Sequence, residues 1–267
     1  MLFSFKITYS AQQITGEVGV KTTLRICADP NNLPYSSQDT EGYENKIANL
    51  FAKKLGNIPV IYAWYPMTSG FVRRTLNAKT CDLIVTFPAI HEFVQNTNPF
   101  YNSSYVLMSL EEKDIKVKTL SDPIIKEKKY KIGIIHATPP SSYVAKYKLF
   151  GQVKFYRQAA DPRKQKPWVD ITNDLVDGKL DIAILWGPYA GYEAKKAKKP
   201  IRIVPLTKEE TVSRGKLVYR FTMGIRRNEP EWEKTINNLI KENQEEINKI
   251  LREYGVPLLD NLGNPLK

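Results

Sequence analysis

Cysteine and histidine are scarce in this sequence of 267 residues, which has only Cys27, Cys81, His91 and His136. No CxxC, HxxxH or CxxCH spacing occurs. Zinc sites and covalently attached haem need several such ligands at short, regular spacing. The scarcity therefore excludes both, and it predicts a chain without a metal or cofactor of its own.

Long hydrophobic runs are also lacking. No stretch approaches the ~20 apolar residues that span a bilayer as a helix, so we expect no membrane insertion. The first ten residues, MLFSFKITYS, contain an apolar patch, but Lys6 interrupts it before it reaches the length of a signal peptide. We interpret residues 1–23 as an N-terminal extension to the fold: a tag, a leader remnant or a linker from an upstream domain.

Acidic residues are outnumbered by basic ones, 28 to 40, which gives a formal net charge of +12 and a pI of about 9.4. Such a balance favours anionic partners, for example an acidic protein. The alternative is a solvated lysine surface, since lysine is spread along the chain and its densest run, 195–199, lies late in a helical segment. No module of interleaved basic and aromatic residues occurs, which argues against nucleic-acid binding.

The two cysteines stand beside predicted strands. Cys27 ends the first strand and Cys81 precedes the third, and these strands are neighbours in the sheet that we predict. The pattern allows a disulfide between them, which an oxidising compartment would favour. The alternative is two buried thiols, because the residues stand at opposite ends of parallel strands and a disulfide needs Cα atoms close together.

Hydrophobic periodicity divides the first part of the chain into alternating strands and helices. Short apolar runs predict strands, and apolar residues at helical spacing before Gly56 predict a helix that ends at this glycine. The predicted strands cover residues 24–28, 60–64, 83–87 and 105–110, and the predicted helices cover 44–55 and 70–77.

The second part repeats this plan. Its turn DGK at 177–179 leads into a strand, as NAK at 77–79 does in the first part. The predicted strands cover residues 131–135, 153–156 and 181–185, and the predicted helices cover 143–148 and 170–176. A long strand at 218–226 leads back, and a final helical stretch at 231–254, continuous or interrupted, ends at Gly255.

These elements predict an α/β fold of two lobes joined by two crossing strands, with an interlobe cleft at the carboxyl ends of the strands. Residues 1–23 are the N-terminal extension. Lobe 1 covers residues 24–111, lobe 2 covers residues 112–222, and a returning segment, 223–267, completes lobe 1.

The order of elements resembles the type II periplasmic binding proteins, amino-acid subgroup, over residues 24–255. The phrases that carry the resemblance are LRICADPNNLPYS at 24–36, GYENKIANLFAKKLG at 42–56, LNAKTCDLIV at 76–85 and NPFYNSSYVL at 98–107. The resemblance implies an Arg after the third strand that binds the ligand carboxylate, lobe 2 hydroxyls and N–H groups that share it, and an Asp that pairs with the ammonium.

This chain departs from that ligand set at each point. Phe87 and Ile90 stand where the pattern Thr-Pro-x-Arg places the Thr and the Arg, and Trp186 stands where the Asp is expected. In lobe 2, Pro139 and Pro140 remove N–H donors beside the one remaining hydroxyl. An amino acid would leave both its charges unpaired there, which is costly. We therefore expect a wide, apolar cleft.

Four shorter motifs resemble a narrower group, the XoxJ/MxaJ family of methanol-oxidation clusters. They are CADPNNLP at 27–34, GYEN at 42–45, GFVR at 70–73 and YGVPLL at 254–259. The resemblance implies a periplasmic accessory protein that interacts with a methanol dehydrogenase dependent on pyrroloquinoline quinone (PQQ), in the Xox branch a lanthanide enzyme. It implies a part in maturation or activation of that enzyme, with its cytochrome c as a further partner. We expect a monomer.

Candidate cleft or partner residues come from strand ends and from the matched motifs. They are Asp29, Asn31, Tyr35, Tyr43, Trp64, Phe71, Arg73, Phe87, Ile90, Trp186 and Tyr189. Each has a structural alternative. The aromatic residues suit a core, Asp29 suits a brace for the Asn31-Asn32 loop, and Arg73 suits a solvated helix position.

Three functions remain open at this stage. The first is a non-catalytic accessory protein whose apolar cleft receives a protein segment. The second is a transporter-linked receptor for a small apolar or weakly polar solute. The third is an enzyme, which needs a coupled acid–base pair. Because no spacing couples His91, His136, Asp29 and Glu44, we expect no catalysis.

Overall fold

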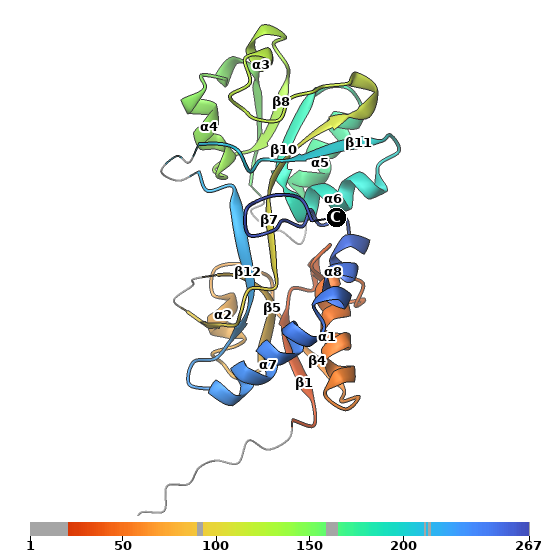
Figure 1. Cartoon of the computed structure of the whole chain (residues 1–267), viewed down its shortest axis with the longest axis vertical. Coiled ribbons are helices and arrows are strands. Elements are labelled where there is room, and N and C mark those ends of the chain that lie inside the picture. Colours follow the sequence, from red (N-terminus) through yellow and green to blue (C-terminus); the bar gives the residue numbers. More distant parts are fainter. Residues whose placement is uncertain (1–20, 90–92, 159–164, 211, 213–214, 267) are drawn as a thin grey trace, which may run out of the picture.

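The computed structural model describes residues 21–89, 93–158, 165–210, 212 and 215–266. These residues form two lobes stacked along the long axis of the molecule (Figure 1), and two long strands, β7 (Tyr101–Leu110) and β12 (Val218–Ile225), run between them. The first half of β7 pairs with β12, and its second half pairs with strand β10 of lobe 2 (Ile182–Trp186). The predicted two-lobed α/β fold with crossing strands is confirmed.

Lobe 1 is built on a parallel sheet in the order β4, β1, β5, which the antiparallel β12 extends. The strands are β1 (Leu24–Ala28), β4 (Val60–Trp64) and β5 (Leu83–Pro88), with the short β2 (Asn31–Asn32), β3 (Ser36–Ser37) and β6 (Gln95–Asn96) at its loops. The helices are α1 (Tyr43–Lys54), α2 (Phe71–Arg74), α7 (Pro230–Glu242) and α8 (Gln244–Glu253).

Lobe 2 repeats the arrangement, with a parallel sheet in the order β9, β8, β10 that β7 extends on the antiparallel side. Its strands are β8 (Ile132–Ile135), β9 (Val153–Tyr156) and β11 (Ile201–Pro205) together with β10. Its helices are α3 (Ile124–Glu127), α4 (Pro140–Lys146), α5 (Pro167–Val176) and α6 (Gly187–Lys196), with 3-10 turns η1 (Glu111–Lys113) and η2 (Phe150–Gln152).

The predicted repeat of strands and helices is confirmed, and the differences lie at element ends. The helix expected over residues 70–77 is only α2, because the Thr75 hydroxyl donates to the Phe71 carbonyl at 2.7 Å and Thr75 leaves the helical conformation. The crossing strand expected at 105–110 begins at Tyr101. The final helical stretch is interrupted at Asn243, whose side-chain amide donates to the Leu239 carbonyl at 2.8 Å. The lobe boundaries at 111 and 222 stay a prediction.

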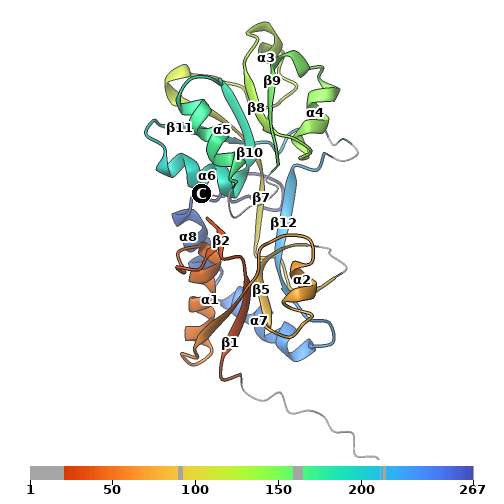
Figure 2. The same cartoon turned by 180° about the vertical axis from the view of Figure 1, so that it is seen from behind.

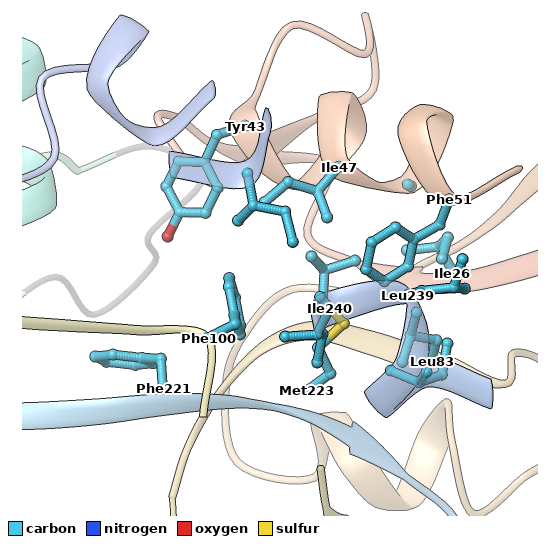
Figure 3. Packing of buried hydrophobic residues seen from close by; sticks show 14 of the residues in the cluster. Ile26, Tyr43, Ile47, Phe51, Leu83, Phe100, Phe221, Met223, Leu239 and Ile240 are labelled. Carbon is cyan, nitrogen blue, oxygen red and sulfur yellow. The ribbon is translucent and has the colours of Figure 1, made fainter. Parts of the chain in front are cut away.

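The core of lobe 1 lies between α1 and the sheet. Tyr43, Ile47 and Phe51 stand four residues apart, so they share the inner face of α1 (Figure 3), and each is fully buried. They meet Ile26 of β1 and Leu239 of α7 in one cluster. Packing of this helical face against the strands fixes the start of α1, which lies next to the cleft.

Cys27 and Cys81 form a disulfide with their Cα atoms 5.3 Å apart. The Asp82 N–H donates to the Arg25 carbonyl at 2.8 Å, so the chain enters β5 directly beside β1. Cys81, the residue before Asp82, therefore lies close to Cys27, and the two cysteines are not held apart at opposite strand ends. Both cysteines are 1% exposed or less, so the bond lies within a small lobe 1 cluster.

A second junction joins the lobes, where α6 of lobe 2 lies against the end of α8 (Figure 2). Gly191 and Gly255 touch there, and a Cβ atom built on Gly191 would stand 1.7 Å from the Gly255 carbonyl oxygen. The rings of Tyr192 and Tyr254 stack beside them at 6.2 Å. The Lys195 ammonium donates to the carbonyls of Arg252 and Glu253 at 2.8 and 2.9 Å. The motif at 254–259 therefore supplies a contact surface for lobe 2.

Within the described residues, no helix is both long and apolar enough to cross a membrane. The same residues hold no cluster of three or more histidine, cysteine or acidic side chains with the geometry of a metal site.

Candidate functional site

A cavity of about 450 Å³ lies between the lobes. Its aromatic walls come from Tyr105 on β7, Trp168 on α5, Trp186 at the end of β10 and Tyr189 on α6. Trp168 and Tyr189 stack with ring centroids 4.1 Å apart, and Trp186 meets Tyr105 edge to face at 5.4 Å. The position that the family pattern assigns to a ligand-binding Asp, residue 186, therefore belongs to an aromatic wall.

Side chains of the protein itself join the lobes across this cleft. The hydrogen bonds are Trp186 Nε1 to Tyr35 Oη at 2.5 Å, Tyr189 Oη to Asn32 Oδ1 at 2.8 Å, and Lys166 Nζ to Asn31 Oδ1 at 2.9 Å. The Tyr35 ring also lies 5.4 Å from that of Tyr189. The expected wide cleft is thus partly filled, because the aromatic residues that replace the charged anchors reach the opposite lobe.

Asp29 holds the lobe 1 side of the cleft in place. Its carboxylate accepts the Asn31 N–H at 2.8 Å and the Met67 N–H at 2.6 Å, and the side chain is 2% exposed. The first bond fixes the loop that contains Asn31 and Asn32, and the second fixes the loop after β4. Asp29 is therefore a brace for two loops, as its structural alternative proposed, and both of its oxygen atoms have donors.

A second hollow, of about 590 Å³, lies next to the cavity on the lobe 1 side. The two hollows share Met67 and Thr68, so they are neighbours. Phe71, Arg73 and Phe87, three of the predicted residues, line this second part together with Phe93. We call the aromatic cavity and the second hollow together the interlobe groove.

Other predicted residues lie elsewhere. Trp64 stacks on Tyr62 with centroids 4.5 Å apart and packs on the lobe 1 core, so it does not line the groove. Tyr43 is fully buried, and its hydroxyl lies 3.2 Å from that of Tyr101. Ile90 lies outside the described residues, as does His91. The sequence reasoning missed Tyr105, Trp168 and Met67, which line the cavity. The one available signal was the proline before Trp168, which marks a helix start.

The chemistry of the groove suits an apolar guest. Among the residues that the structure describes, no acidic side chain lines either hollow, and Arg73 is the basic residue that lines the second. The Thr138 hydroxyl, the remaining candidate from the anion site of the family, donates to the Ile135 carbonyl at 2.6 Å. Of the four acid–base candidates, Asp29 is engaged with backbone donors and His136 is exposed.

Glu44 lies behind the cleft at the start of α1. Its side chain is 3% exposed, and Oε1 has no hydrogen-bond partner within the described part of the protein. Burial raises the pKa of this carboxyl to about 7, although the nearby polar side chains of Thr86 and Ser36 oppose the shift. The neutral form is thus favoured in the folded protein.

Glu44→Gln should remove a pH dependence of stability. The folded protein keeps the Glu44 proton up to about pH 7, whereas the unfolded chain loses it near pH 4.5, so the free energy of unfolding should fall as pH rises between these values. The variant should be more stable than the parent by about 1–3 kcal/mol at pH 8 and little different at pH 4. Urea unfolding at both pH values measures this, with the exposed Glu245→Gln as control. Equal stabilisation at both pH values would contradict the assignment.

Removing two of the cross-lobe hydrogen bonds should open the cleft. The double variant Trp186→Phe, Tyr189→Phe keeps ring packing but deletes the donors to Tyr35 and Asn32. We expect a loss of about 1–2 kcal/mol and a larger radius of gyration in X-ray scattering. Trp64→Phe, within lobe 1, is the control. An unchanged radius in the double variant would show that other contacts hold the lobes together.

The family model for bacterial extracellular solute-binding proteins, family 3, matches residues 24–257. The chain belongs to this family. Within it, the predicted XoxJ/MxaJ group is confirmed by a solved relative, periplasmic binding protein XoxJ from Methylobacterium extorquens AM1. It is 37% identical, with a TM-score of 0.74 over 89% of this chain and 100% of that chain.

Two further relatives agree with this placement. Protein MoxJ from Methylorubrum extorquens is 27% identical over 252 residues, which cover 89% of this chain and 82% of that protein. MxaJ from Methlophaga aminisulfidivorans MPT is 22% identical, covers 88% of this chain and all of that chain, and has a TM-score of 0.74, which shows a shared fold. In this family member, the protein's own aromatic side chains bridge the cleft.

Proposed function

We propose that this protein is a non-catalytic periplasmic accessory protein that binds a PQQ-dependent methanol dehydrogenase, of the lanthanide type, and helps it to mature or become active. The observation that carries the proposal is that aromatic and apolar side chains stand where charged residues would bind an amino acid. Two of these aromatic side chains form hydrogen bonds across the cleft. Such a site disfavours a charged metabolite and suits apolar groups of a protein segment. The likeness to XoxJ points to methanol oxidation as the setting.

The charge distribution supports an acidic protein as the partner. Residues 112–222 contain 24 Lys and Arg against 12 Asp and Glu, whereas the rest of the chain contains 16 of each. The entire net charge of +12 therefore belongs to this segment. A field concentrated on one lobe steers an acidic partner toward that lobe and accelerates association.

Mixing the protein with its cognate methanol dehydrogenase tests the proposal. We expect co-elution on a sizing column or a change in dehydrogenase activity, with association that weakens as salt concentration rises. Replacing three exposed lysines of lobe 2, Lys126, Lys128 and Lys129, by Glu reverses their charge and should slow association. The same charge reversal at the exposed Lys234, Lys241 and Lys249 of lobe 1 is the matched control. The absence of both co-elution and altered dehydrogenase activity would reject the proposal.

A second candidate is a transporter-linked receptor for a small apolar solute. The cavity volume of about 450 Å³ favours it, because small-molecule sites have about 300–1,000 Å³. A tight ligand raises the melting temperature by mass action. A clear hit in a thermal-shift screen, together with absence of dehydrogenase binding, would favour this function over the first.

A further inference from the structure

The interlobe groove has two adjacent parts. They are the aromatic cavity and the second hollow beside α2, with volumes of about 450 and about 590 Å³, and Met67 and Thr68 line both. Met67 is 37% exposed, and Phe93 in the second hollow is 60% exposed. Both apolar side chains are therefore accessible to a guest in the groove.

A single cation marks the far part of this groove. Arg73 is exposed and lines the second hollow, and no described acidic residue pairs with it. Its neighbour Arg74 differs, because its guanidinium lies over the Tyr65 ring at 5.7 Å and it does not line the hollow. Within the described part of the chain, no acidic side chain lines either part of the groove. The described lining therefore offers a guest one positive charge, that of Arg73.

We propose, building on the function proposed above, that the groove recognises an extended protein segment with two features. One large apolar side chain enters the cavity that Trp168, Trp186 and Tyr189 line. An acidic side chain elsewhere in the same segment pairs with Arg73.

Each feature follows from the lining of its part of the groove. Burial of a large apolar side chain against aromatic walls supplies binding free energy in proportion to its area. A carboxylate on a guanidinium forms a charge-assisted, bidentate pair that fixes the direction of the segment. A free amino acid would also bring an ammonium, which finds no acidic partner among the described lining residues.

Selection from a random octapeptide library tests this without any assumption about the dehydrogenase. The full chain is immobilised, and bound peptides are sequenced. We expect enrichment of peptides that combine one Phe, Trp or Leu with an Asp or Glu at a fixed separation. Synthetic capped peptides of the enriched type should lose at least tenfold in affinity when the acid is replaced by Lys.

Three variants locate the two contacts. Arg73→Glu should reverse the preference, so that peptides with Lys in place of the acid bind at least tenfold better than those with the acid. Arg74→Glu, the matched control, should leave the preference unchanged. Gln158→Trp places a large side chain at an exposed position that lines the cavity, and it should abolish the preference for the large apolar residue.

The inference is overturned if the selected peptides show no acidic enrichment, or if Arg73→Glu and Arg74→Glu behave alike. It is also overturned if no peptide is enriched, or if free indole binds the cavity as tightly as the best peptide. These outcomes are separate from dehydrogenase binding. Peptide recognition without dehydrogenase binding would reject the proposed partner but keep the proposed peptide preference. Dehydrogenase binding without peptide recognition would mean that the dehydrogenase binds another surface of the protein.

Discussion

Gly191→Ala should destabilise the protein by about 2–3 kcal/mol. On helix propensity alone, alanine would stabilise this position in α6 by about 1 kcal/mol. Packing reverses the sign, because the added Cβ would stand 1.7 Å from the Gly255 carbonyl oxygen, which is backbone and cannot turn away. The helix must then move off the end of α8, which should also change the relative orientation of the lobes.

Urea unfolding measures the first effect, and X-ray scattering of the folded variant measures the second. Gly151→Ala is the control, because a Cβ built on Gly151 has no atom within 4 Å. A Gly191→Ala protein as stable as the parent, with the same scattering curve, would show that the contact between α6 and α8 does not set the lobe orientation.

Asp82→Asn should cost about 3 kcal/mol of stability. The carboxylate is 3% exposed, and it accepts hydrogen bonds from Arg25 at 2.9 and 2.7 Å and from Arg226 at 2.6 Å. Asparagine lacks the negative charge, so the guanidinium groups of Arg25 and Arg226 lose the carboxylate that they share beside the sheet of lobe 1. Asp114→Asn is the control, because its pair with Lys116 is exposed on both sides and should contribute less than about 1 kcal/mol.

The pH dependence of this difference provides an independent check. Burial alone would raise the pKa of Asp82, but the bonds from Arg25 and Arg226 outweigh it and lower the pKa from 3.8 to about 2. A lowered folded-state pKa stabilises the protein above pH 3.8, and this contribution is lost as pH falls toward 2. The stability difference between parent and Asp82→Asn, measured by urea unfolding, should therefore shrink below about pH 4. A constant difference down to pH 2.5 would contradict the ion-pair assignment.

Much of the candidate site could be predicted from strand ends. Trp186 ends β10, Tyr189 follows it, and Phe87 lies at the end of β5, where parallel strands of both lobes present their carboxyl ends to the cleft. Trp64 also lies at a strand end, yet its ring turns onto Tyr62. A strand end places a residue near the cleft, but side-chain packing decides whether the residue faces it.

The fold itself was predictable because its signals are local. Apolar spacing in α1, the turn before β10 and the glycine after α8 each act over a few residues. Their order along the chain then leaves few topologies, and the repeat of the two parts selects the two-lobed one.

The sequence by itself therefore determined the two-lobed α/β fold, the absence of the usual amino-acid anchors and the net positive charge. Only the tertiary structure decided that Trp186 meets Tyr35, a residue 151 positions away, and that Gly191 rests on Gly255. It also decided that the aromatic cavity lies next to the hollow that Arg73 lines. The reason is physical: periodicity specifies which face of an element is buried, whereas contacts between elements depend on side-chain shapes that meet only once the lobes have packed.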